Sequence, residues 1–275
     1  MGYEDAPWIF KGRALYQLHL VKVADAKKYI PENFHIVSLF GYTLGGFYLA
    51  RYSDSPVGKF DELVALAGLV WNPPTSCAWA ARVYVSNWQA RNHGRRHCGL
   101  PSRMAAFEEK TEVIEKGPPS WWTQQQRGKG ALDEARSHPV LLHNEERRSW
   151  LQPWKAPAQG LRTPVCSMAL PPARRKGWPG PRIRLSLPSF SGGTHECPDL
   201  LQYTCQLVTN VRAVTPAQVQ ACSGQEDNPQ EALPSIFRGR PVLALAFDDM
   251  EMVVNAPKVL ALPHRKGANV QPVMA

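Results

Sequence analysis

Residues 60–102 constrain the fold more than any other part of this 275-residue sequence. The segment contains two long apolar runs on either side of a Pro-Pro turn at positions 73 and 74, and then a polar stretch at 95–98 that reads Arg-Arg-His-Cys. Apolar runs of this length, bounded by turn signals, are typical of buried strands. In β-scaffolds, two strands joined by a turn and followed by a charged stretch commonly present polar groups at the mouth of a cavity. We therefore expect residues 60–102 to form a hairpin that helps to build a pocket.

The other periodic segments favour strands as well. Residues 14–23 and 182–187 alternate apolar and polar side chains, which is the period of a strand with one face in the core. Further strands are expected at 34–40, 44–52, 102–113, 163–170, 201–214 and 241–256. Helical segments are expected at 26–30 and 86–92, the second capped by Ser86 and ended by Gly94. Without a βαβ rhythm, the fold class is predicted to be mainly β with few peripheral helices (α+β), in a sheet that closes on itself or packs as two layers.

The domain organisation is predicted from length and local composition. A chain of 275 residues with 44% hydrophobic residues can bury one large core, so residues 1–275 are expected to form a single domain. Residues 117–160 are rich in Pro, Gln, Gly and charge and keep no regular period. We expect a poorly ordered insertion there, or an artefact of the gene model, and a frayed tail at 264–275.

The net charge of +9 is concentrated in one short region. Residues 161–182 contain five basic residues and no acidic one, in a Pro-rich context without interleaved aromatic platforms. Such a segment is typical of a solvated connector, so no nucleic-acid partner is predicted. No apolar run is long enough to span a bilayer, and no secretory signal is recognisable. The expected location is cytoplasmic by default, with plastid association left open.

The six cysteines show no C-x-x-C pair and no regular spacing. They are expected to be reduced rather than disulfide-bonded. His195, Cys197 and Cys205 are the nearest approach to a set of metal ligands, but they lack a fourth ligand at zinc-site spacing. We therefore predict no metal and no cofactor.

Longer motifs are spread over residues 7–113 and 180–257. They read PWIFKGRALYQL at 7–18, GYTLGG at 41–46, FDEL at 60–63, GLVWNPPTSCAWAAR at 68–82, HGR at 93–95, GLPS at 99–102, LPSFSG at 187–192 and MEM at 250–252. These motifs resemble the plant and algal neoxanthin-deficient protein family, which belongs to the acetoacetate decarboxylase-like superfamily. The resemblance implies a closed antiparallel β-barrel with an interior pocket and helices outside it. Members of the superfamily form large oligomers, so the resemblance leaves open whether this protein forms a homo-oligomer.

The resemblance also implies a set of pocket residues. Acetoacetate decarboxylase forms a Schiff base between a neutral lysine and its keto acid. Aligned on Gly-Leu-Pro at 99–101, the resemblance puts Arg96 at the position of that lysine and His97 beside it. A guanidinium stays protonated, so Arg96 cannot supply the free amine. The resemblance further implies Arg13 as the substrate-facing arginine and Glu62 as the acidic residue beside the lysine. The predicted ligand pocket therefore contains Arg13, Glu62, Arg96 and His97, with Glu62 and Arg96 as catalytic candidates if the protein is an enzyme.

Each of these residues also has a structural interpretation. Arg13 fits a surface charge, and Glu62 fits an ion pair with an arginine. Arg96 and His97 fit solvated positions in a loop. The site is thus predicted as a binding site that lacks the covalent step.

Three functions from different classes follow. The favoured one is a non-catalytic or accessory protein required for biosynthesis of the xanthophyll neoxanthin, with an apolar terpenoid or a small carboxylate bound in the barrel pocket. The alternative is a decarboxylase or lyase-like enzyme that acts on a keto acid or related carbonyl compound without a Schiff base. The third is a basic adaptor that binds RNA or anionic lipid through residues 161–182.

Overall fold

The structure, a computed structural model, describes residues 3, 5–109, 139–145, 162–170, 180–221 and 235–260. Strands dominate these residues, with two short α-helices and one 3-10 helix. The elements are β1 (Trp8–Lys22), α1 (Val23–Ala26), β2 (Tyr42–Asp54), β3 (Phe60–Asn72), β4 (Thr75–Val85), α2 (Trp88–His97), β5 (Ser102–Glu109), β6 (Pro139–Glu145), β7 (Arg162–Ala169), β8 (Arg182–Gly192), β9 (Leu200–Ala213), β10 (Gln218–Ala221), η1 (Ser235–Arg238), β11 (Arg240–Val254) and β12 (Lys258–Leu260).

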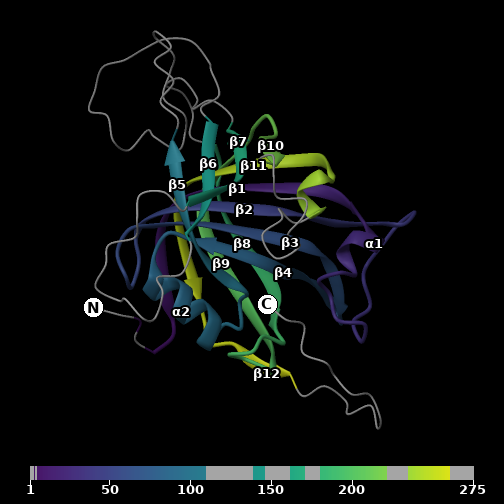
Figure 1. The fold of residues 1–275 in the computed structure, drawn as a ribbon. Helices are drawn as coiled ribbons and strands as arrows, with labels where there is room; N and C mark the ends of the chain where they lie inside the picture. The colour runs from purple at the N-terminus through teal and green to yellow at the C-terminus, as the bar shows by residue number, and fades with distance from the viewer. Residues whose placement is uncertain are drawn as a thin grey trace.

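Seven strands close into a barrel, in the order β4-β3-β2-β1-β11-β9-β8 and back to β4 (Figure 1). Neighbouring strands are antiparallel except for β4 and β8, which pair in parallel through Ala78 with Ser189 and Trp79 with Phe190. An odd number of strands cannot alternate in direction all the way around a closed ring, so one neighbouring pair must be parallel. The predicted mainly β fold, closed into a barrel with peripheral helices, is confirmed.

A second sheet extends from β4 beyond the barrel. β5 runs parallel to the end of β4, and β6, β7 and β10 follow it in antiparallel order. β6 lies inside residues 117–160, where the composition predicts an irregular insertion. In this strand Val140 and Leu142 alternate into the core, where they lie beside Cys166 and Met168. Their apolar pattern is shorter than the polar segments around it, and for that reason the composition of 117–160 does not reveal the strand. The rest of 117–160 and the tail 264–275 lie outside the described residues.

The helix α2 is longer than the sequence predicts. It begins after Asn87, whose side chain accepts hydrogen bonds from two backbone N–H groups of the first turn, and it runs through Gly94 to His97. Gly94 does not end the helix, which continues to His97. A Cβ at position 94 would lie 2.8 Å from the Ser102 hydroxyl oxygen. This glycine is required for close packing of α2 on β5.

Two smaller differences concern the segment between β1 and β2. The first helix is Val23–Ala26 instead of 26–30, and the expected strand at 34–40 is limited to isolated bridges at Ile36 and Leu39. The five cysteines among the described residues are free. Neither α-helix in the described part of the chain has the length and apolar character needed to cross a bilayer.

We expect Gly99→Ala to destabilise the protein more than Gly193→Ala. Both glycines have positive φ angles, 59° and 67°, so alanine at either position carries backbone strain of about 1–2 kcal/mol. A Cβ at Gly99 would in addition lie 2.9 Å from the backbone Cα of Gly192, whereas a Cβ at Gly193 has no atom within 4 Å. The extra crowding is expected to cost about 1–3 kcal/mol. Denaturant titration of both variants measures the difference, and equal losses would contradict the packing argument.

Candidate functional site

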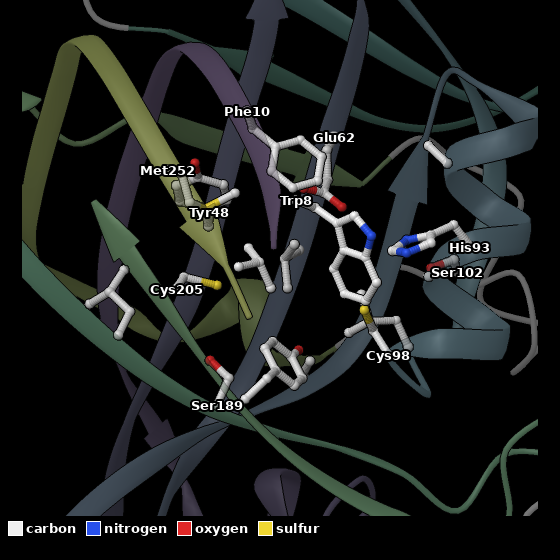
Figure 2. A pocket seen from close by; sticks show the side chains of 18 of the residues that line it. Trp8, Phe10, Tyr48, Glu62, His93, Cys98, Ser102, Ser189, Cys205 and Met252 are labelled. Carbon is white, nitrogen blue, oxygen red and sulfur yellow. The ribbon is translucent and has the colours of Figure 1, made fainter. Parts of the chain in front are cut away.

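A cavity of about 130 Å³ lies inside the barrel, beside α2 (Figure 2). Apolar and aromatic side chains form most of its wall, and half of the lining residues come from 60–102, the segment that the sequence singles out. The lining residues are Tyr3, Trp8, Phe10, Tyr16, Tyr48, Tyr52, Phe60, Glu62, Val64, Leu66, Ala78, Ala80, Ala90, His93, Gly94, Cys98, Leu100, Ser102, Leu187, Ser189, Tyr203, Cys205, Met252 and Val254.

Strand alternation decides which residues face the cavity. Successive side chains of a strand point to opposite faces, so Phe60, Glu62 and Val64 of β3 line the cavity while Asp61 faces outward. On the outer face Asp61 forms a salt bridge with Arg51 of β2, with 2.9 Å between the Arg51 Nε and Asp61 Oδ1 atoms. The neighbouring acidic residues of β3 therefore have different environments, one paired with a cation and the other enclosed in the barrel.

Glu62 is the carboxyl group of the cavity. The Tyr52 hydroxyl donates a hydrogen bond of 2.9 Å to Glu62 Oε2. Burial raises the pKa of Glu62 from 4.5 to about 7, even though the hydrogen bond from Tyr52 acts in the opposite direction. The carboxyl group is thus able to exchange a proton near neutral pH, and in its neutral form it can also donate a hydrogen bond to a ligand.

His93 of α2 lies on the same cavity and is only 8% exposed. Its ring stacks on Tyr3, with 3.6 Å between ring centroids, and meets the edge of Trp8 at 4.2 Å. Burial, with a smaller contribution from His97, lowers the pKa of His93 to about 3, so the imidazole is neutral at physiological pH. Its buried Nε2 atom has no hydrogen-bond partner among the described residues. A neutral imidazole with an unused hydrogen-bonding atom therefore lines the cavity.

The structure does not bring the four predicted pocket residues together. Glu62 lies on the cavity wall. Arg96 and His97 are exposed on α2 because the helix continues through Gly94 and turns their side chains toward solvent, although the His97 ring lies 5.0 Å from the ring of His93.

Arg13 lies on the outer face of the barrel. It lies directly opposite Arg51 in the register of β1 and β2. Directly opposed residues of antiparallel strands share one face of the sheet. Arg51 in turn pairs with Asp61, the outward neighbour of Glu62. Asp248 of the irregular β11 segment is near enough to interact electrostatically with Arg13. Arg13 therefore belongs to a charged cluster outside the cavity.

Sequence reasoning missed several cavity residues, above all His93 and Ser102. Ala90, His93 and Gly94 follow the three- and four-residue spacing of one helix face, which is a signal that can be recognised once α2 is extended past Gly94. Ser102 is buried at the start of β5 and has no comparable pattern. Among the described lining residues there is no lysine or arginine. The described residues also contain no group of His, Cys, Asp or Glu side chains that is placed to bind a metal ion.

Curated relatives match nearly the whole chain. Protein NEOXANTHIN-DEFICIENT 1 of Oryza sativa is 41% identical, with 96% of this chain and 92% of the relative covered. The proteins of the same name from Arabidopsis thaliana and Solanum lycopersicum are 41% and 42% identical and cover 94% of this chain each. The chain belongs to the NEOXANTHIN-DEFICIENT 1 family. No protein-family model matches it.

Solved structures place this NEOXANTHIN-DEFICIENT 1 family member in the acetoacetate decarboxylase-like fold. An acetoacetate decarboxylase aligns with a TM-score of 0.56 and 11% identity over 94% of this chain and 91% of that protein. The enduracididine biosynthesis enzyme MppR, in complex with pyruvate, aligns with a TM-score of 0.56 and 13% identity over 94% of this chain and 92% of that enzyme. At this identity the likeness concerns the fold alone, and function has to be argued from the cavity.

We expect Glu62→Gln to stabilise the protein at alkaline pH. The pKa of Glu62 is about 7 in the folded state and near 4.5 in the unfolded chain, so between these pH values the folded state holds a proton that the unfolded state has released. Stability therefore falls as pH rises from 4.5 to 7, and ionisation costs about 3 kcal/mol above that window.

Denaturation midpoints at pH 4.5 and pH 8 measure this effect. Glu62→Gln should gain stability relative to the wild type between the two pH values, while Glu251→Gln, at an exposed position of β11, serves as the control for loss of a carboxylate. An equal pH dependence in all three proteins would contradict the assignment.

Proposed function

We propose that the protein is a non-catalytic accessory protein of neoxanthin biosynthesis that binds a small molecule in its barrel cavity. The name of its relatives, at 41–42% identity over most of the chain, supports the biosynthetic role. The cavity lining supports the non-catalytic role, because its described residues include no lysine and so no amine that could form a Schiff base with a keto acid.

The composition of the cavity supports ligand binding. Ligand sites are concave and mostly apolar, with a few polar groups that fix the orientation of the ligand. Here the aromatic rings of Trp8, Phe10 and Tyr52 supply apolar surface, and Glu62 and His93 supply the polar groups. An apolar terpenoid and a small carboxylate are the two ligand classes that follow from the proposal.

A cavity-filling substitution tests the ligand role. A tomato line that lacks its own NEOXANTHIN-DEFICIENT 1 can be complemented with this chain or its variants, and neoxanthin is quantified by chromatography. We expect the wild type to restore neoxanthin and Val64→Trp, whose indole would fill the cavity, to fail. Val242→Trp, at a position of β11 that is 47% exposed, is the matched control and should restore it. Full activity of Val64→Trp would overturn ligand binding in the cavity.

One observation favours a catalytic alternative. A carboxyl group with a pKa of about 7 is suited to general acid-base catalysis, so Glu62 has the property required in a decarboxylase or lyase that works without a Schiff base. Glu62→Gln separates the two functions, because glutamine keeps the shape and hydrogen bonds of a neutral carboxyl group but cannot transfer a proton. In the same complementation experiment the accessory function predicts that Glu62→Gln restores neoxanthin. Loss of neoxanthin, together with loss of keto-acid turnover by the purified variant, would establish the enzyme instead.

A further inference from the structure

The cavity is lined by groups that are neutral or negative. Glu62 is its carboxyl group, His93 is neutral, and the described lining contains no lysine or arginine. The tyrosines of the cavity are protonated, since burial raises the pKa of Tyr16 to about 12 and raises the pKa of Tyr203 well above its usual value. A carboxylate ligand would therefore be buried without a cation to pair with it, which is strongly unfavourable. The electrostatics of the cavity select against an anion.

Two polar groups of the cavity have hydrogen-bonding capacity left for a ligand. The Nε2 atom of His93 is buried and has no partner among the described residues, and the ring is held in place by its stack on Tyr3. Glu62 already accepts a hydrogen bond from Tyr52 at one oxygen, Oε2. Both side chains line the cavity, and Figure 2 shows His93 next to the Trp8 indole.

A hydroxyl group fits this pair of partners in each of their protonation states. It can donate to a ring nitrogen or accept from a ring N–H, so it suits either tautomer of the His93 imidazole. It can likewise donate to an ionised Glu62 or accept from a neutral one. A carboxylate ligand can only accept, and therefore has no favourable contact with an ionised Glu62.

The volume of the cavity limits the size of what it encloses. A water molecule requires about 10–15 Å³ of such space, so a cavity of about 130 Å³ holds roughly ten waters, or a group of about ten to twelve non-hydrogen atoms. One substituted six-membered ring with a short polar substituent has this size. A whole xanthophyll is several times larger, whereas the trimethylcyclohexenyl ring at the end of a cyclic carotenoid matches it.

We propose that the cavity binds an uncharged alicyclic ring that carries a hydroxyl group, and that His93 and Glu62 are the hydrogen-bonding partners of that hydroxyl. The aromatic side chains enclose the ring, and the absence of a cation among the described lining residues excludes the corresponding acids. This inference rests on the proposed function, because it specifies the ligand class of the same cavity. Of the two classes named there, it retains the terpenoid and removes the small carboxylate.

Three probes with one carbon skeleton test the charge selectivity. They are the monocyclic alcohol β-cyclogeraniol, its acid β-cyclogeranic acid, and the hydrocarbon 1,2,3,3-tetramethylcyclohexene, in which a methyl group replaces the hydroxymethyl group. Calorimetric titration of the full chain at pH 6.5, where the acid is ionised, is expected to show binding of the alcohol at least about tenfold tighter than that of the acid. Equal or tighter binding of the acid would overturn the inference while leaving ligand binding in place. Failure of all three probes to bind would instead overturn the proposed function.

The variant His93→Phe tests the hydrogen bond. Phenylalanine keeps an aromatic ring against Tyr3 but removes the Nε2 atom. Its affinity for the alcohol should fall about fivefold to tenfold, as expected for one hydrogen bond, while its affinity for the hydrocarbon should be unchanged or higher. An equal loss for both probes would mean that His93 only shapes the cavity, and would overturn its role as a partner. The comparison of alcohol with acid on the wild type does not depend on the folding of this variant.

Discussion

The contact that closes the barrel is the parallel pairing of β4 with β8. It is short, with Ala78 opposite Ser189 and Trp79 opposite Phe190, but it converts a curved sheet into a ring of seven strands. The same region holds the end of α2, because the Ser191 hydroxyl donates to the Cys98 carbonyl and the Gly192 N–H donates to the Gly99 carbonyl. Closure of the ring and placement of the helix are therefore coupled, and the cavity exists because both occur together.

The chemistry of the cavity follows from its enclosure. A carboxyl group placed among aromatic rings loses hydration, which favours its neutral form, and an imidazole in the same place favours its neutral form as well. The arginines near Glu62 in the sheet, Arg13 and Arg51, lie on the outer face of the barrel, where Arg51 is paired with Asp61. The protein thus has the fold of acetoacetate decarboxylase. The described wall of its cavity, however, contains no lysine amine that could attack a ligand covalently.

Local patterns made much of this predictable. The strands within 60–85 were predicted from continuous apolar runs and the strand at 182–187 from alternation, and neither signal depends on distant residues. Once a strand is assigned at 60–72, its alternation puts Glu62 on the face opposite to Asp61. The family resemblance added the closed barrel. The strand β6 was missed because its apolar signal is short, and the end of α2 was misplaced because glycine commonly ends helices. At Gly94 the glycine serves close packing instead, which turns Arg96 to solvent and brings His93 onto the cavity.

The sequence by itself determined the strand-rich fold class and the segment that forms half of the cavity wall. These properties depend on residue type and on spacing along the chain. Only the tertiary structure decided that Arg13 lies outside the barrel and that His93 is buried with an unused nitrogen. The first depends on the register between β1 and β2, and the second on how α2 packs against Tyr3, Trp8 and Ser102. Register and packing are set by contacts between residues far apart in the chain, and for that reason the sequence pattern does not reveal them.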